Sequence, residues 1–559
     1  MNKIHLKISF VLLMILTETF STKGQQNKTY PAIEKVSLFT DRSIYITGED
    51  VHFSAFLSPH DKKQPELSLI LYAEIVSPDG KSLAGSKFPI VNYAASGDLT
   101  IPKDIITGVY YMRAYTKYMR NMGPDAYCYV AVKIVNPLRS DVMTGNDTTK
   151  VAKNEAIAGN TANAFVISLD KNKYAPRDVV NVAIKATGIK ASDVQGLSIS
   201  VVPEASSSEN ILQVPAYDHQ VTSLRFLPET RGVSITGILK DNTSGKAVPD
   251  TRVNLSIIGK GRDFMAMQTD SAGRYFFSLP AYTGFRDLFL CAENTAGFHP
   301  KIIVDNDFCL EPVHLPSPIF KLTADERAAT YNMAVNARLR KLFAADTIPC
   351  AVADKRADKA SYGEPSEILV IDKYVQLPTL EDYFFELPTF VKVRKRHGEK
   401  YLKVIGTQAE MTIFDPLMLV DWIAVADPAK ILAISPSNID RIELVYEPYV
   451  KGDITYGGIV NIISKRGDFA GIDLPASGIF LNYLFLDNSR ICTASDSNSA
   501  NIPDARNTLY WDPNLVLNAD NSTHFKFTTP DTPGRYAIVL KGISRDGNPF
   551  TRTEVFEVK

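Results

Sequence analysis

Apolar and polar residues alternate along most of the chain, and this two-residue period predicts β-strands with one buried face. The segment Val51–Leu57, VHFSAFL, shows the period clearly. A long helical period is confined to Thr323–Leu342, which opens with a Thr-Ala-Asp-Glu capping box. We therefore predict a mainly β chain, built as a string of antiparallel β-sandwich domains with one long helix.

The stretch from Asp415 to Gly467 predicts a small α+β unit. Its pattern gives a buried strand, a short helix and two further strands, in the order Leu417–Val420, Pro428–Leu432, Ile439–Val445 and Ile459–Ile463. Asp427 suits the helix cap, because its side chain can accept from the first turn. Before the last strand, Gly457 and Gly458 permit a tight turn that side chains would block, so we expect a positive φ at one of them.

This order of elements, with Tyr456-Gly457-Gly458 before the last strand, resembles the plug domain of TonB-dependent outer-membrane receptors. That family usually has Asp-Gly in the first turn, where this chain has Asp421-Trp422. The resemblance implies structural or docking roles for five residues: Asp421, Trp422, Tyr456, Gly457 and Gly458. The family's plug lies inside a barrel of about 22 strands, which needs several hundred residues. Only residues 468–559 follow here, so we expect this chain to form no barrel of its own.

A second resemblance starts from Val36–Leu57, which contains D-R-S-I-Y-I-T-G-E-D-V. This segment resembles the opening of the second macroglobulin-like domain of the alpha-2-macroglobulins, which implies a seven-stranded antiparallel sandwich similar to fibronectin type III. Gly108–Tyr115 matches a late strand of that domain. The opening recurs more weakly at Ile167–Ile184, where Asp170 and Tyr174 keep their spacing. The glycine is missing from this copy, so we expect a different turn.

Two further segments resemble known sandwiches. Gly232–Pro280 has strands joined by turns at Asp241–Gly245 and Asp270–Gly273, and it resembles the carboxypeptidase regulatory-like domain, a small transthyretin-like sandwich. That domain carries no catalytic residues in the enzymes that contain it, so the resemblance does not imply a peptidase. The C-terminal segment Thr508–Phe550 resembles a closing macroglobulin-type segment. It is short for a full sandwich, so we expect it to borrow strands from the stretch that precedes it.

These patterns divide the chain at turn-rich and polar stretches. The predicted order is a signal peptide, a macroglobulin-like sandwich, a linker, a second macroglobulin-like segment, a carboxypeptidase regulatory-like sandwich, a helix with a linker, a plug-like domain, a further linker and a C-terminal macroglobulin-like segment. Their respective bounds are residues 1–24, 25–137, 138–164, 165–229, 230–313, 314–366, 367–470, 471–507 and 508–559.

The N-terminus has the layout of a secretory signal peptide. Two lysines precede an apolar run from Ile8 to Leu16 that is too short to span a bilayer, and small and polar residues follow up to Gly24. We expect the mature chain to start at Gln25. No cysteine lies near this site, so no lipoprotein anchor is expected, and no later stretch is long and apolar enough to be transmembrane. The mature chain is therefore predicted to be exported and to be periplasmic or associated with the outer membrane.

Net charge limits the kinds of partner to expect, and the cysteines limit the disulfides and metal sites to expect. The formal net charge is −1, which gives no basic field for nucleic acid. The densest cationic cluster, Arg394–Arg396 beside His397-Gly398, predicts a hairpin tip; a solvated turn is the simpler interpretation, and a docking patch for an acidic partner is the alternative. Cys291 and Cys309 are the one pair to test for a disulfide. Otherwise an odd number of widely spaced cysteines predicts buried free thiols and no zinc site: Cys128, Cys291, Cys309, Cys350 and Cys492.

No catalytic motif is assembled in the sequence. The eight histidines lack the H-x-x-E and H-E-x-x-H spacings of zinc peptidases, and no G-x-S-x-G elbow occurs. Cys492 is followed by Thr-Ala-Ser, so the Cys-x-x-Gln thioester of macroglobulin protease traps is absent. Asp440 and Glu443 are expected to face solvent by alternation. We therefore predict no catalytic residue, no metal and no cofactor.

Three functional hypotheses follow from the sequence. The first is a non-catalytic, exported cell-envelope protein that acts as a binding or structural module and docks on an outer-membrane partner, with sandwich edges available for strand addition. The second is an accessory of a separate TonB-dependent transport system. The third is a protease-inhibitor-like macroglobulin relative or a peptidase-associated enzyme. The combination of the three domain types is similar to that of exported envelope proteins of the Bacteroidetes, which favours the first hypothesis.

Overall fold

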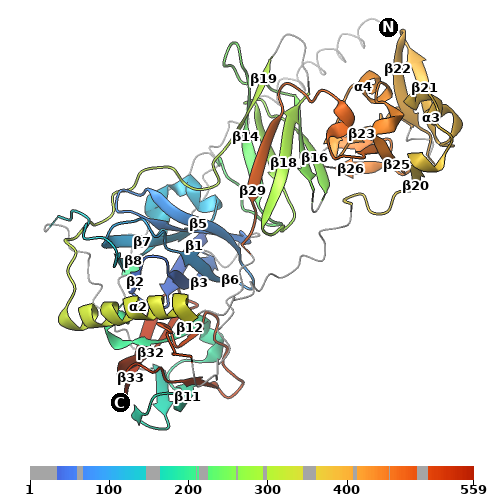
Figure 1. Cartoon of the computed structure of the whole chain (residues 1–559). Helices are drawn as coiled ribbons and strands as arrows, with labels where there is room; N and C mark the ends of the chain where they lie inside the picture. Colours follow the sequence, from blue (N-terminus) through green and yellow to red (C-terminus); the bar gives the residue numbers. More distant parts are fainter. Residues whose placement is uncertain are drawn as a thin grey trace, which may run out of the picture.

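The chain folds into three β-sandwiches and a smaller α+β domain. In Figure 1 the first sandwich lies between the second and the third, and the α+β domain lies beyond the third. The structure is a computed structural model. It describes residues 34–59, 67–146, 164–208, 211–212, 224–259, 262–293, 299–343, 360–406, 412–451, 454–487 and 502–559. The predicted signal peptide, the predicted start at Gln25 and two cysteines, Cys350 and Cys492, lie outside these residues. The prediction of a mainly β chain is confirmed.

The first sandwich packs a sheet of order β1-β3-β6 against a sheet of order β13-β8-β7-β4-β5, with β2 beside β8. Strand β7 is buried along its whole length, because its outer face is covered by the segment around Cys309 and Pro316. The strands are β1 (Glu34–Thr40), β2 (Ile44–Ile46), β3 (Asp50–Pro59), β4 (Ile70–Val76), β5 (Ser82–Pro89), β6 (Ala94–Thr100), β7 (Gly108–Tyr115), β8 (Cys128–Val135) and β13 (Ile211–Leu212).

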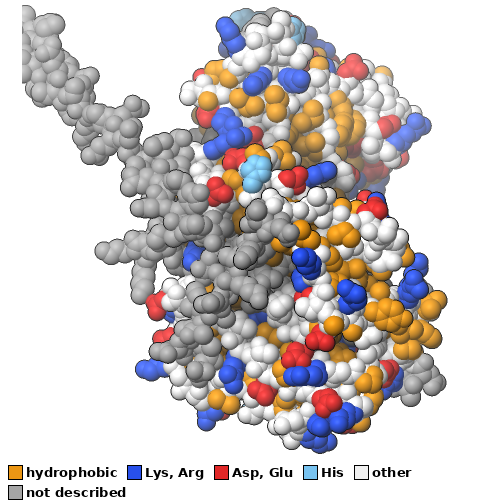
Figure 2. Space-filling view, turned by 90° about the vertical axis from the view of Figure 1, so that its left-hand side faces the viewer, with side chains coloured by type: hydrophobic (Ala, Val, Ile, Leu, Met, Phe, Trp, Pro, Cys, Tyr) orange, Lys and Arg blue, Asp and Glu red, His pale blue; other side chains and the backbone are white. Residues whose placement is uncertain are grey.

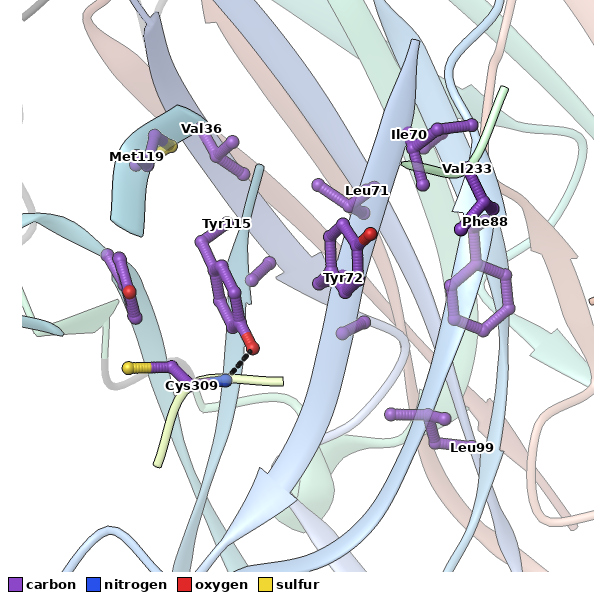
Figure 3. Close-up of a cluster of buried hydrophobic side chains, with 14 of the residues drawn as sticks. Val36, Ile70, Leu71, Tyr72, Phe88, Leu99, Tyr115, Met119, Val233 and Cys309 are labelled. Atoms are coloured by element: carbon purple, nitrogen blue, oxygen red, sulfur yellow. Dashed lines mark hydrogen bonds between the residues drawn. The ribbon is translucent and has the colours of Figure 1, made fainter. Parts of the chain in front are cut away.

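The first and third sandwiches share one cluster of buried apolar side chains. Figure 3 shows part of this shared cluster, with Cys309 near Tyr115, and Val233 near Ile70 and Phe88. The rings of Tyr72 and Tyr115 stack with centroids 5.7 Å apart, and the Cys309 amide donates to the Tyr115 hydroxyl at 2.9 Å. Cys309 and Cys291 are both free thiols, so no disulfide joins them.

The second sandwich is assembled from two stretches that are far apart in the sequence. Its sheets have the orders β10-β33-β32-β12-β30 and β31-β11-β9. The C-terminal strands therefore pair with β10, β11 and β12, and the expectation that they borrow strands from the stretch just before them is wrong. The third sandwich and the α+β domain are inserted between the two halves. The strands are β9 (Phe165–Leu169), β10 (Lys173–Tyr174), β11 (Val179–Ala186), β12 (Val194–Pro203), β30 (Tyr510–Asp512), β31 (Ser522–Thr528), β32 (Gly534–Ser544) and β33 (Pro549–Val558).

The internal repeat predicted in the first two sandwiches is visible in the geometry of its tyrosines. The Tyr45 hydroxyl donates to Asp41 Oδ1 at 2.6 Å, and the Tyr174 hydroxyl donates to Asp170 Oδ1 at 2.7 Å. In both copies the hydroxyl also accepts from the amide that follows the aspartate, at 3.1 Å. The shared spacing thus encodes the same local turn twice.

The next turn of the second copy was expected to differ, because it lacks a glycine. Its backbone instead keeps the left-handed conformation: Arg177 has φ +63°, and Gly48 at the corresponding place has φ +85°. The Arg177 guanidinium donates to both carboxylate oxygens of Asp531, at 2.7 and 2.8 Å. This bidentate pair holds a side chain in place where the backbone alone would favour glycine.

The third sandwich has sheets of order β17-β14-β19 and β16-β15-β18-β29. Both predicted turns are present, because Gly245 and Gly273 have positive φ and donate to the carbonyls of Asp241 and Asp270, each at 2.8 Å. Strand β29 follows the α+β domain in sequence, so that domain is inserted into this sandwich. The strands are β14 (Ser234–Asp241), β15 (Arg252–Ile258), β16 (Asp263–Gln268), β17 (Arg274–Ser278), β18 (Phe285–Ala292), β19 (Pro300–Val304) and β29 (Ile479–Leu484).

The α+β domain, residues 360–472, has a sheet of order β20-β25-β28-β23-β24 and two separate hairpins, β21–β22 and β26–β27. The predicted elements between Asp415 and Gly467 are confirmed, and Asp427 caps α4 by accepting from the Ala429 amide at 2.9 Å. The elements are β20 (Glu367–Val370), α3 (Leu380–Glu386), β21 (Val391–Arg396), β22 (Glu399–Val404), β23 (Leu417–Val420), β24 (Ile423–Ala424), α4 (Pro428–Leu432), β25 (Ile439–Val445), β26 (Tyr449–Lys451), β27 (Ile454–Tyr456) and β28 (Ile459–Ser464).

Helix α2 (Ala324–Phe343) is the longest helix of the described residues and lies across the first and second sandwiches (Figure 1). The predicted capping box is present: the Thr323 amide donates to Glu326 Oε2 at 2.8 Å, and the Glu326 amide donates to Thr323 Oγ1 at 3.2 Å. Lys133 of β8 pairs with the same Glu326 at 2.7 Å. The cap of the helix is therefore also its attachment to the first sandwich.

Candidate docking surface

Asp421 and Trp422 form the two-residue turn between β23 and β24. Both have positive φ, +46° and +74°, which is the sign pattern of a type I′ turn and normally favours Asp-Gly or Asn-Gly. The Asp421 carboxylate accepts from the Ser464 amide at 2.8 Å, the Ser464 hydroxyl at 2.6 Å and the Phe469 amide at 2.9 Å. These three bonds fix the turn to the end of β28. They hold the backbone of Trp422 in a conformation that normally favours glycine.

The Trp422 side chain is buried under a segment that precedes β20. Its ring stacks on Tyr362, with centroids 4.9 Å apart and 13° between the planes. The Tyr362 hydroxyl donates to Glu443 and accepts from Asn461 Nδ2 at 3.0 Å, and burial is the main cause that raises the pKa of Tyr362. The expectation that Glu443 faces solvent is wrong, because this covering segment closes its side of the sheet; Asp440 stays partly exposed.

Tyr456 lies on the same face of the sheet and is also buried. Its ring meets Phe264 of β16 edge-on, with centroids 6.2 Å apart, and burial raises the pKa of Tyr456 to about 12. The expected positive φ is found at Gly458, with φ +99°. The Gly457 amide donates to the Asp415 carbonyl at 3.0 Å, so the turn is anchored to the segment just before β23.

These residues belong to a contact between the α+β domain and the third sandwich. Phe264 and Ala266 of β16 share one apolar cluster with Leu419 and Ile459 of the domain's sheet. Lys451 Nζ pairs with Asp263 Oδ1 at 2.9 Å at the border of the cluster. Trp422 and Tyr456 therefore lie in this contact, while the three other predicted residues shape the turns that support it: Asp421, Gly457 and Gly458.

The macroglobulin-like motif of the first sandwich forms a buried polar joint. Asp41 pairs with Arg42 Nε at 3.2 Å, and Glu49 pairs with Arg42 Nη1 at 3.4 Å and with Arg340 Nη2 of α2 at 2.9 Å. Asn507, near the start of the C-terminal half of the second sandwich, donates to Glu49 as well. Burial alone would raise the pKa of Glu49, but the charges of Arg42 and Arg340 outweigh it and hold that pKa below its ordinary value. The joint therefore ties both sandwiches to α2.

A second buried group of charges joins the first sandwich to the third. Lys87 Nζ pairs with Asp307 Oδ2 at 2.6 Å, and Lys117 Nζ lies 3.6 Å from Asp307 and 3.8 Å from Glu229. Burial raises the pKa of Glu229 and lowers the pKa of Lys87. Titratable groups with such shifts are candidates for catalysis. Here the lysine and glutamate side chains are closed off from solvent, so the arrangement fits a structural joint.

Strand β29 is a candidate docking edge, although it lies within the linker predicted for residues 471–507. Its sequence, IFLNYL, carries no charge, and no described strand pairs with its outer side. Phe480 is 55% exposed, and Phe285 of the neighbouring β18 is 68% exposed. The signal was present in the sequence, since a short apolar run interrupted only by Asn482 is a strand pattern.

Acidic, histidine and cysteine side chains are dispersed over the described part of the chain. Over the described ranges, no group of three or more His, Cys, Asp or Glu side chains is placed to hold a metal ion. On the face shown in Figure 2, lysines and arginines are interspersed with aspartates and glutamates, in keeping with the net charge of −1. None of the described helices has the length and apolar character needed to cross a membrane.

The antiparallel sandwiches of this chain are nested in one another. Comparisons with known proteins cover its sequence and its structure. No protein-family model matches the sequence, and no curated protein matches it. The native alpha-2-macroglobulin of Escherichia coli matches at 10% identity, over 96% of this chain and 40% of its own, with a TM-score of 0.24. The methylamine-reacted alpha-2-macroglobulin of Salmonella matches at 10% identity, over 94% of this chain and 40% of its own, with a TM-score of 0.24.

The D0–D1 domain of intimin matches 49% of this chain and 98% of its own length, at 12% identity and a TM-score of 0.14. The chain thus spans less than half the length of the macroglobulins it matches.

Proposed function

We propose that this chain is a non-catalytic, exported cell-envelope protein that binds another envelope protein by accepting an added strand at the free edge of β29. The observation that carries the proposal is an uncharged edge strand with two exposed phenylalanines, Phe480 in β29 itself and Phe285 in the neighbouring β18. Natural edge strands are usually protected by charged residues, proline or a bulge, because an open edge is a template for pairing. Within Ile479–Leu484 there is neither charge nor proline.

The register of β29 leaves alternate main-chain groups for a partner. The Phe485 amide donates to the Gly284 carbonyl at 3.0 Å, so residue 485 faces β18. In an antiparallel ladder, residues of one parity bond to the same neighbour. The odd-numbered residues of β29 therefore face β18, and Phe480, Asn482 and Leu484 direct their amides and carbonyls outward. An extended segment can form main-chain hydrogen bonds there without any special side chain.

A binding role also agrees with how the polar residues of the chain are used. Two buried charge groups, around Glu49 and around Asp307, are closed joints between domains. The predicted signal peptide supports export. The residues that resemble the plug family are assigned a structural role, because they hold the α+β domain on the third sandwich or support that contact: Asp421, Trp422, Tyr456, Gly457 and Gly458.

Affinity capture from solubilised envelopes tests the proposal, with residues 25–559 as bait and Asn482→Pro and Asn482→Ala in parallel. Both variants lose the side-chain bond from Asn482 to Asp287, and only proline also removes the outward amide. We expect the alanine variant to capture the same envelope protein as the unchanged chain, and the proline variant to bind it at least about tenfold more weakly.

Capture of no envelope protein, or equal capture by the proline and alanine variants, would show that strand addition at β29 is wrong. A captured outer-membrane transporter would favour the accessory role in TonB-dependent transport, since that role differs from the general one only in the partner. Circular dichroism of each variant is the control for folding.

A further inference from the structure

A basic β-hairpin lies at the far end of the α+β domain. Strands β21 and β22 pair along residues 391–404, with His397 and Gly398 at the tip, both in the left-handed conformation. Figure 1 places this hairpin and α3 at the end of the molecule away from the second sandwich. Residues 391–404 contain six lysines and arginines and one glutamate, although the whole chain has a net charge of −1. The positive charge is therefore concentrated at this end.

The pairing register places like charges directly opposite each other. Lys392 faces Lys403, and Lys395 faces Lys400. Such cross-strand pairs destabilise a hairpin, because the two ammonium groups repel at close distance. Two of the six cross-strand positions of this hairpin are occupied in this way. The stability of the hairpin therefore does not account for its charge.

Two of the six cations have acidic partners. Lys400 pairs with Glu381 of α3, and Lys403 Nζ lies 3.5 Å from Asp415 Oδ1. Asp382 is already engaged, because it caps α3 together with Thr379. Glu399 lies opposite Arg396 in the register. Within the described part of the chain, no acidic side chain forms an ion pair with the remaining four cations, which are Lys392, Arg394, Lys395 and Arg396.

Exposed apolar side chains lie on the α3 side of the hairpin. Phe385 is 78% exposed and follows Glu381 by one helical turn, so it lies on the helix face that reaches Lys400. Val375 is 84% exposed, and its carbonyl accepts from the Tyr383 hydroxyl at 3.4 Å, which ties the loop to α3. Unpaired cations and exposed apolar groups therefore occur together at one end of the domain.

We propose that this basic hairpin, with Phe385 and Val375, binds an anionic lipid surface. The cations attract lipid phosphates at the headgroup level, and the two apolar side chains enter the boundary with the acyl chains. An acidic protein partner would account for the cations but would leave the apolar side chains unexplained. The terminal position of the hairpin makes it accessible to a flat surface (Figure 1). This inference goes beyond the proposed strand addition and does not depend on it.

Sedimentation with lipid vesicles tests the inference on purified residues 25–559. Vesicles of phosphatidylglycerol and phosphatidylcholine in equal amounts should bind the chain, and vesicles of phosphatidylcholine alone should bind it at least about tenfold more weakly. Binding should fall with added salt, because the screening length shrinks from about 10 Å at 0.1 M to about 3 Å at 1 M. Equal binding to both kinds of vesicle, or binding to neither, would overturn the proposal and leave an acidic protein as the occupant.

Paired variants locate the binding surface. Arg394→Gln with Arg396→Gln should weaken binding to anionic vesicles by roughly fivefold for each charge removed. Lys240→Gln with Lys301→Gln is the matched control, because it removes the same charge from an opposed lysine pair in β14 and β19 of the third sandwich. Equal losses in both double variants would mean that net charge, not the hairpin, determines binding. Asn482→Pro should bind vesicles as the unchanged chain does, so a failure of strand addition stays distinguishable.

Discussion

Replacing Gly458 by alanine should destabilise the α+β domain much more than the same replacement at Gly398. Both glycines have a left-handed backbone, with φ +99° and +88°. They differ in the space around them. A Cβ atom at Gly458 would lie 2.6 Å from the Val445 carbonyl oxygen and 2.9 Å from Val404 Cγ1, whereas nothing lies within 4 Å of a Cβ atom at Gly398.

The two sites therefore share one cost, and Gly458 carries a second. A left-handed alanine costs about 1 kcal/mol of backbone strain at either position. At Gly458 the main chain of β25 and the Val404 side chain must also move in a packed core, which adds about 1–3 kcal/mol. We expect Gly398→Ala to lower the free energy of unfolding by about 1 kcal/mol, and Gly458→Ala to lower it by about 2–4 kcal/mol. In a domain of this size the two melting midpoints should differ by at least about 4 °C.

Tryptophan fluorescence can follow the unfolding of the α+β domain separately, once the tryptophan outside it is replaced. The chain has two tryptophans, Trp422 in the α+β domain and Trp511 in the second sandwich. In a Trp511→Phe background the emission of Trp422 follows only the α+β domain, which matters because a chain of several domains does not unfold in one two-state step. Equal midpoints for Gly398→Ala and Gly458→Ala would refute the close approach of Gly458 to Val445.

Two further predictions concern the hydrogen bonds of Asp421 and His52. Asp421→Ala should lower the stability reported by Trp422 by about 2–4 kcal/mol, because it leaves the buried donors around β28 without an acceptor; Asp421→Asn, which keeps one acceptor, should lose less in the same assay. Burial alone would lower the pKa of His52, but its hydrogen bond to Asp98 and nearby carboxylate charges raise that pKa above 6.5. The stabilisation is therefore complete below pH 6.5 and is lost as the pH rises through the folded-state pKa. Urea midpoints should fall over that range, and a His52→Gln variant that shows the same decline would contradict this assignment.

The elements of the α+β domain could be predicted from the sequence because their signals are local. The Asp427 side chain caps α4 by accepting from the amide two residues later, and the Thr323 side chain caps α2 by accepting from the amide three residues later. Neither bond depends on the rest of the fold. The glycine turn before β28 is local too, since a positive φ at Gly458 follows from the turn itself.

Pairings between distant segments could not be predicted in this way. Strand β11 pairs with β31, and β12 pairs with β32, across the whole inserted part of the chain. Alternation shows that each is a strand but contains no information about its neighbour. The buried position of Glu443 was missed for the same reason, because the residue that covers it, Tyr362, is remote in sequence. The alternation around Asp440 and Glu443 predicts the strand, but it cannot predict which segment packs over that strand.

The nested connectivity has a consequence for the two proposed binding surfaces. The α+β domain leads directly into the sheet of the third sandwich, since β29 follows it and pairs with β18. Its contact with the sandwich is apolar around Phe264 and Tyr456, and it is bordered by the ion pair of Lys451 with Asp263. The short connection to β29 and the buried contact together leave the domain little freedom to rotate. The basic hairpin and the open edge of β29 are therefore parts of one body, so that binding of the hairpin to lipid headgroups would hold the β29 edge at a fixed distance from the membrane.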